Sequence, residues 1–203
     1  MLPTLPEGYE VKGLQYPGRD RNFDCNSQVP TGYHNERTVF YVFGRYPKWE
    51  DHQRRYPITD LIVCHGDFLN ATRNYAHKNC STRGFGSYGD ILLRDRKMYV
   101  APTPFALTNG TIGNRTLILP ENMKVDERFK EVGRLERTES DWLLSSYTFN
   151  FDKNNLKGDF ADNPTKGKVH RFVAYRCKEA AGDPVEMSTV KDFKSEEEDD
   201  CGD

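Results

Sequence analysis

The chain has 203 residues and a mass of 23.5 kDa, which is long enough for one domain with a sizeable core. Its 29 basic and 31 acidic residues give a net charge of -2 and are mixed along most of the sequence, which argues against a nucleic-acid-binding protein. No apolar run approaches the roughly 20 residues of a membrane-spanning helix. We therefore expect a soluble protein with no nucleic-acid partner and no membrane span.

Three regions of different composition divide the chain. Residues 1–36 contain several prolines and glycines with little apolar periodicity, so we expect an extended N-terminal arm with turns. Residues 37–193 carry the apolar patterning and are expected to form one β domain. Residues 194–203 concentrate acidic side chains without apolar spacing, which predicts a disordered acidic tail.

Short segments rich in β-branched and aromatic residues predict the strands of the β domain. They lie at 37–43, 59–64, 85–93, 97–101, 115–119, 142–151 and 168–177, and the segment LKGDF after DKNN forms a hairpin with 142–151. One short helix is expected between residues 123 and 138, where Val125, Phe129, Val132 and Leu135 recur at helical spacing.

This pattern of strands favours a mainly β fold, a single antiparallel β-barrel or β-sandwich of about seven to nine strands. A lipocalin-like barrel fits the same pattern, although the Gly-x-Trp motif that opens that family is absent from the first strand region. Gly-rich phosphate loops and strand-helix alternation are also absent, which argues against nucleotide-binding α/β folds.

Cysteines and glycosylation triplets point to the secretory pathway. Asn-x-Ser/Thr triplets begin at Asn70, Asn79, Asn109 and Asn114, and the chain contains five cysteines. Because disulfides persist only in oxidising compartments, the combination predicts a secreted glycoprotein, although the N-terminus lacks the features of a signal peptide. We expect one disulfide between Cys64 and Cys80 and a second between Cys25 and Cys177, with Cys201 as an alternative partner of Cys177.

The segment from residue 61 to residue 80 also permits a metal site. Cys64, His77 and Cys80 offer thiolate and imidazole ligands of the kind that zinc accepts. His65 cannot readily join Cys64 at one ion, since adjacent residues of a strand point to opposite faces. This alternative describes an intracellular zinc-binding protein, whereas the preferred hypothesis includes no metal and no cofactor.

Aromatic residues on or beside the predicted strands suggest a binding function. Turned into a barrel lumen, they would line a site for a small apolar ligand, and the candidates are Tyr99, Trp142, Tyr147, Phe172 and Tyr175. Ordinary core packing is the alternative for such side chains. A protein partner bound on a sheet face is the other form that a binding function can take, and the oligomeric state is left open.

The second alternative is an enzyme of the same β architecture, a hydrolase or isomerase. General acid-base catalysis needs a histidine beside a carboxylate. His170 on the last predicted strand is the main candidate, with Asp67 or Asp90 as its carboxylate and His65 as a second histidine. A solvent-facing histidine without a special role is the ordinary interpretation of His170.

Overall fold

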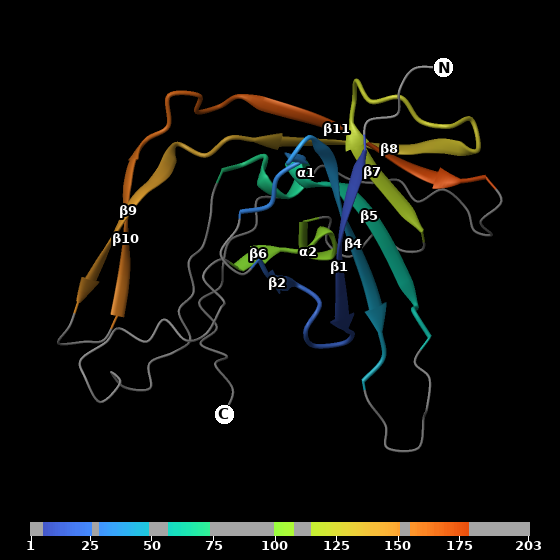
Figure 1. The fold of residues 1–203 in the computed structure, drawn as a ribbon, viewed down its shortest axis with the longest axis horizontal. Coiled ribbons are helices and arrows are strands. Elements are labelled where there is room, and N and C mark those ends of the chain that lie inside the picture. The colour runs from blue at the N-terminus through green and yellow to red at the C-terminus, as the bar shows by residue number, and fades with distance from the viewer. Residues whose placement is uncertain are drawn as a thin grey trace.

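The computed structural model describes residues 6–25, 29–48, 57–73, 100–107, 115–150 and 155–178. These ranges are mainly β, as predicted, and their largest sheet has seven strands (Figure 1). The strand order is β1-β4-β5-β7-β11-β8, with β3 also paired to β4. The bounds are Glu7–Gln15 (β1), Tyr33–His34 (β3), Arg37–Tyr46 (β4), Asp60–His65 (β5), Thr116–Pro120 (β7), Phe129–Thr138 (β8) and Val169–Cys177 (β11).

The prediction of a closed antiparallel barrel or sandwich is wrong, because this sheet is open and mixed. β1 runs parallel to β4 and β5 runs parallel to β7, while the other neighbouring strands are antiparallel. β1 and β8 lie at opposite ends of the strand order and are not paired with each other. Parallel neighbours require crossover connections, which a pattern of strand-sized segments does not reveal. The lumen expected inside a barrel is therefore not part of this fold.

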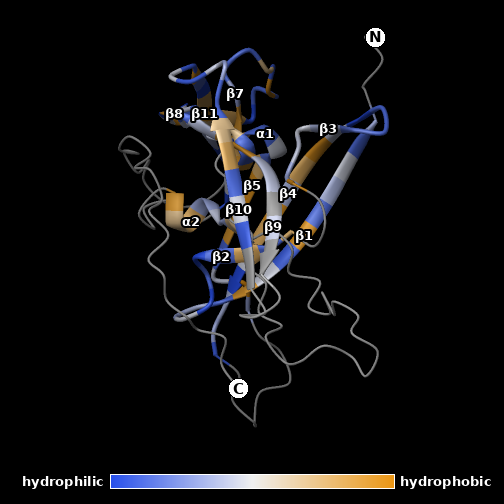
Figure 2. Ribbon diagram, turned by 90° about the vertical axis from the view of Figure 1, so that its left-hand side faces the viewer, coloured by the Kyte–Doolittle hydropathy of each residue, from blue (hydrophilic) through white to orange (hydrophobic). Residues whose placement is uncertain are grey.

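Strands form in the predicted N-terminal arm and in the predicted helix. Residues 7–15, expected within an extended arm, form β1 and extend the sheet beyond β4 (Figure 2). The helix predicted between residues 123 and 138 is wrong, since residues 129–138 form β8 and pair with β11 along their whole length. Gly133 weakens a helix there, and pairing within the sheet outweighs a weak local periodicity.

The main core cluster lies on one face of the seven-stranded sheet, while Phe40, Leu119 and Val173 are buried on the opposite face. Alternate residues of the central strands are fully buried on the core face, namely Phe43, Ile62, Cys64, Ile118 and Ala174. A small sheet of β2 (Asn22–Asp24) and β6 (Val100–Pro102), followed by helix α2 (Pro104–Leu107), covers this face. Phe23 of β2 meets Phe43 edge to face, with ring centroids 4.9 Å apart.

Helix α1 (Gly66–Asn70) covers the same face further along the sheet. Its Phe68 packs edge to face on Phe172 of β11, with ring centroids 5.2 Å apart. Phe172 is 3% exposed and belongs to the core, which is the ordinary packing alternative for this side chain. None of the helices in the described part of the chain is long and apolar enough to span a membrane.

The predicted hairpin at residues 142–160 is confirmed. β9 (Trp142–Asn150) and β10 (Asn155–Asp162) form an antiparallel pair that projects from one end of the large sheet (Figure 1). A bulge lies beside Asp159 and Phe160, where two residues of β9 oppose one of β10. Trp142 at its base is 57% exposed, which places this predicted ligand residue on the surface.

The cysteines in the described ranges, Cys25, Cys64 and Cys177, are free thiols. The structure therefore contains neither the predicted Cys25–Cys177 disulfide nor a disulfide at Cys64; Cys80 itself lies outside the described residues. Cys64 packs inside the core instead of at the start of a surface loop, and this burial raises the pKa of its thiol. Of the four glycosylation candidates, Asn70 ends helix α1 and is half-buried, while Asn79, Asn109 and Asn114 lie outside the described ranges.

Candidate functional site

An apolar row crosses the face of the large sheet that is opposite the core. Its members lie beside one another in five adjacent strands, and we call them the open-face row: Val11, Val42, Val63, Leu117 and Tyr175. Val42 lies between the core residues Tyr41 and Phe43 on its strand, and Val63 lies between Ile62 and Cys64. Because successive side chains of a strand point to opposite faces, the row points away from the core.

The open-face row is only partly covered. Val11 is 70% exposed, and the other four members are half-buried. Beside the row, Tyr9 stacks on Phe40 with ring centroids 5.8 Å apart. At the far end, Tyr175 lies opposite Glu131 of β8, which forms an exposed ion pair with Arg134 at 2.8 Å. An apolar centre that ends at charged groups is the usual anatomy of a protein-protein interface.

The sequence contains a pattern that indicates this second apolar face, but the predicted site residues were not chosen from that pattern. The segments TVFYVF, LIV and LIL are continuous apolar runs, without the polar residues that alternate along a strand with one solvated face. Such runs are typical of strands that meet apolar surroundings on both sides. Among the predicted ligand residues, only Tyr175 belongs to the open-face row.

A second feature is a buried polar cluster around Glu139, at the base of the β9–β10 hairpin. The side chain of Glu139 is fully buried, and its Oε1 lies 2.7 Å from Nε2 of His170 on β11. Its Oε2 accepts hydrogen bonds from Asn163 Nδ2 at 3.2 Å and from the Thr165 hydroxyl. Arg73, in the segment after α1, completes the cluster with its Nε 3.4 Å from the same oxygen.

These contacts keep Glu139 charged. Burial by itself raises the pKa of this carboxyl, but the hydrogen bonds from Thr165, His170 and Asn163 and the charge of Arg73 outweigh it and hold the pKa at about 2. Both carboxylate oxygens are occupied by groups of the protein, and the Nε2 of His170 is directed at Glu139. The pair therefore joins β8, β11 and the hairpin base, which is a structural role.

Arg137 strengthens the same junction two residues earlier on β8. Its side chain is buried with Leu135 and Glu139, which share its side of the strand. One guanidinium nitrogen donates to the backbone oxygen of Phe68 in α1, and the other lies 3.3 Å from the Thr72 hydroxyl. The cluster thus fixes α1 to the end of β8. Neither Arg137 nor Glu139 was among the predicted site residues.

His65 and Asp67, the other predicted catalytic residues, lie together at the start of α1. Asp67 Oδ1 accepts from the Gly32 backbone N–H at 2.8 Å, and His65 Nδ1 accepts from the Asp67 N–H at 3.4 Å. A side-chain carbon on Gly32 would lie only 1.9 Å from the His65 ring, and one on Gly66 only 1.9 Å from the backbone oxygen of Thr31. The end of β5 and the start of α1 therefore pack tightly against the segment that contains Thr31 and Gly32.

The environment of His65 agrees with this packing role. Its side chain is 9% exposed, and its ring meets Phe40 edge to face with centroids 5.8 Å apart. Burial lowers the pKa of His65, against the opposing effect of the Asp67 carboxylate at 3.6 Å. The two predicted catalytic histidines consequently belong to separate clusters, each with its own carboxylate.

The remaining predicted residues are tested only in part. Tyr99, His77 and Asp90 lie outside the described residues, as does the side chain of Tyr147. Within the described ranges, no group of three or more His, Cys, Asp or Glu side chains is arranged to hold a metal ion. The zinc site at Cys64, His77 and Cys80 stays a prediction, because two of its three ligands lie outside those ranges.

Comparison with known proteins adds no relative. No family model, no curated protein and no solved structure matches this chain.

Proposed function

We propose that this protein is a protein-binding module whose partner docks on the open-face row. The observation that carries the proposal is the row itself, five apolar side chains in register on the side of the sheet away from the core. Contiguous apolar surface of this kind marks interaction sites on soluble domains. The partner is a folded protein with an apolar patch of its own.

The length of the row favours a protein over a small molecule as the partner. Strands lie about 4.8 Å apart in a sheet, so five of them spread the row over roughly 19 Å. A small ligand needs a concave site that buries most of its surface, and the barrel lumen that would have supplied one is not part of the fold. A protein surface can contact all five side chains at once.

An enzymatic function receives less support. The most promising acid-base pair, His170 with Glu139, has its carboxylate fully buried and hydrogen-bonded to Asn163 and Thr165. A general base must reach a substrate proton, and this carboxylate is enclosed by its own chain. We retain secretion and N-glycosylation as part of the proposal on the support of the four glycosylation triplets.

Site-specific photocrosslinking tests the proposal. A benzophenone amino acid replaces Tyr175 in the row in one variant and Trp142 on the hairpin in a control variant, and both are irradiated in extract and medium of the source cells. We expect a crosslinked partner from position 175 only. With the purified partner, Tyr175→Lys should weaken binding by about 10-fold or more, whereas Trp142→Lys should leave it unchanged.

Two outcomes would contradict the proposal. Crosslinking from position 142 alone would move the binding surface to the hairpin. A partner whose affinity does not change with Tyr175→Lys would show that the row is not its docking surface.

A further inference from the structure

Strand β1 leaves one edge of the large sheet open. Within the described residues it pairs with β4 alone, apart from a bridge between Gln15 and Arg19 at its end. Its pairing with β4 is regular over nine residues, and it contains neither a proline nor a bulge of the kind that usually blunts an edge strand. Val11 is 70% exposed and Tyr9 is 59% exposed. The edge can therefore receive another extended strand.

The pairing with β4 shows which backbone groups of β1 face outward. Thr38 N–H donates to the Pro6 carbonyl at 3.0 Å, and Tyr16 N–H donates to the Tyr46 carbonyl at 2.8 Å. In a parallel pair, alternate residues of a strand bond the same neighbour. The even-numbered residues of β1 therefore bond β4, while the odd-numbered residues from 7 to 13 turn their N–H and C=O groups to the open edge.

We infer that β1 pairs with β1 of a second copy of this chain, antiparallel and centred on Val11. A two-fold axis at Val11 places Val11 opposite Val11, Tyr9 opposite Gly13 and Glu10 opposite Lys12. The outward-facing odd residues then form the hydrogen-bonded pairs. Glu10 and Lys12 fall in the other class of pair, in which the Cα atoms are only about 4.5 Å apart and opposite charges attract most strongly.

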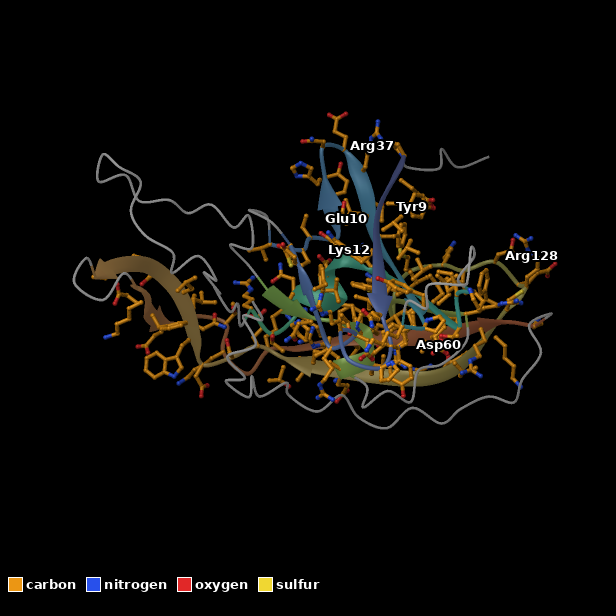
Figure 3. All side chains as sticks on the ribbon, turned by 90° about the horizontal axis from the view of Figure 1, so that it is seen from below. Tyr9, Glu10, Lys12, Arg37, Asp60 and Arg128 are labelled. Carbon is orange, nitrogen blue, oxygen red and sulfur yellow. The ribbon has the colours of Figure 1, made fainter. Side chains whose placement is uncertain are left out.

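Charge favours this register over its two nearest alternatives. The two nearest symmetric registers, centred on residue 10 or residue 12, would place Glu10 opposite Glu10 or Lys12 opposite Lys12, and like charges directly opposite are destabilising. Within one chain Lys12 Nζ already lies 2.8 Å from Glu10 Oε1. Figure 3 shows both side chains on one side of β1 and Tyr9 on the other. In the dimer the four charged groups would alternate in sign.

The open-face side of the edge is complementary as well. Tyr9 would lie across from Gly13, and an aromatic ring opposite a glycine shields the exposed backbone of a sheet. The contact between the two Val11 side chains would continue the open-face row into the second copy. This inference concerns the edge of the sheet and a self-partner, so it stands or fails separately from the proposed function.

Sedimentation equilibrium of the full chain tests the pairing. We expect the wild-type chain to form a dimer. The dissociation constant of the dimer should rise by about 10-fold or more in either Glu10→Lys or Lys12→Glu. An equimolar mixture of these two variants should form a heterodimer, because every opposed pair is then Lys with Glu. The double variant Glu10→Lys/Lys12→Glu should recover the dimer, and Glu136→Lys on β8 should leave it unchanged.

Val11→Pro gives an independent test through the backbone. It removes an outward N–H while sparing the bonds to β4, so we expect a folded monomer, with folding checked by circular dichroism. A wild-type chain that is monomeric at the highest concentration reached would overturn the inference. A dimer that is indifferent to both charge reversals and to Val11→Pro would overturn it too.

Discussion

Glu139 shows how one charged residue can organise several segments of this protein. Its carboxylate is fully buried and receives hydrogen bonds from the loop after β10 and from His170 on β11. The backbone adds to the same junction, since Glu139 N–H donates to Lys168 O and Gly167 N–H donates to Glu139 O. A buried carboxylate is tolerated only when such partners replace water. The orientation of the hairpin therefore depends on this residue.

Glu139→Gln should lower the free energy of unfolding by about 2 kcal/mol, because the amide removes the charge and gives one position a donor where an acceptor is required. Urea denaturation measures this change. Glu136→Gln is a matched control, since Glu136 is exposed and pairs only with Arg171 at 2.9 Å, and we expect a loss below about 0.5 kcal/mol.

The free energy of unfolding should also depend on pH through Glu139. The pKa of Glu139 is about 2 in the folded chain, against an ordinary value of 4.5. Its stabilising contribution is therefore complete above about pH 4.5 and is lost as the pH falls towards 2. Glu139→Gln should flatten the stability profile in that window. If the free energy of unfolding changed equally with pH in the wild type and in Glu139→Gln, Glu139 would not be the charged group that these contacts stabilise.

Of the residues in this cluster, only His170 was singled out from the sequence. In the enzyme alternative His170 was paired with Asp67 or Asp90, whereas the structure places it beside Glu139, which lies 31 residues earlier. Leu135 and Arg137 on β8 and Glu139 just after it are all buried, but two charges at alternate positions resemble a solvated strand face. Only the partners from α1, β11 and the loop after β10 make their burial possible, and those partners are distant in the sequence.

Among the elements, β4 is held to its neighbours by Arg45. The guanidinium carbon lies 3.7 Å from the ring centroid of Phe105 in α2 and 4.4 Å from that of Tyr16. Its nitrogens lie 2.5 Å from an oxygen of Asp20 and 3.6 Å from one of Asp60. One side chain thus connects β4 with β5, α2 and the segment between β1 and β2.

Arg45→Met should destabilise the protein by about 3 kcal/mol, because Asp20, whose side chain is 9% exposed, loses its main counter-charge. The double variant Arg45→Met/Asp20→Asn should recover part of the lost stability, since it no longer buries an unpaired carboxylate at position 20. Chemical denaturation of the three proteins checks the series. A single variant as stable as Arg171→Met, which breaks only an exposed pair, would show that Arg45 has no such role.

Elements with strong local signals were predictable. The segments that form β4, β5, β7, β9 and β11 have β-branched or aromatic runs, and β10 follows the turn-forming DKNN after β9; strands were expected at each of them. β1 has a sparse pattern, EGYEVKGLQ, because an edge strand buries little of its surface. The residues of β8 predicted a helix instead, because Phe129, Val132 and Leu135 recur at helical spacing. Pairing with β11, which is distant in the sequence, makes this segment a strand.

For the complete fold, most of the strands were predicted, but their order was not. Sequence neighbours such as β4 and β5 pair directly, whereas β5 lies beside β7 and β11 lies between β7 and β8. A barrel was the simplest arrangement of short strands without strong helices, because it removes the edges. The open arrangement leaves a partly exposed apolar row on one face, and within the described residues it leaves one edge of β1 without a neighbouring strand. Both proposals depend on these two features.

Residue-resolved amide hydrogen exchange along β1, in dilute solution, tests the open sheet most directly. We expect alternation: the N–H groups of residues 8, 10, 12 and 14 are protected by β4, while those of residues 7, 9, 11 and 13 exchange rapidly. Raising the protein concentration should protect the second set as copies pair. Uniform protection in dilute solution would indicate a strand bonded on both sides, as in a closed barrel, and would contradict the open sheet.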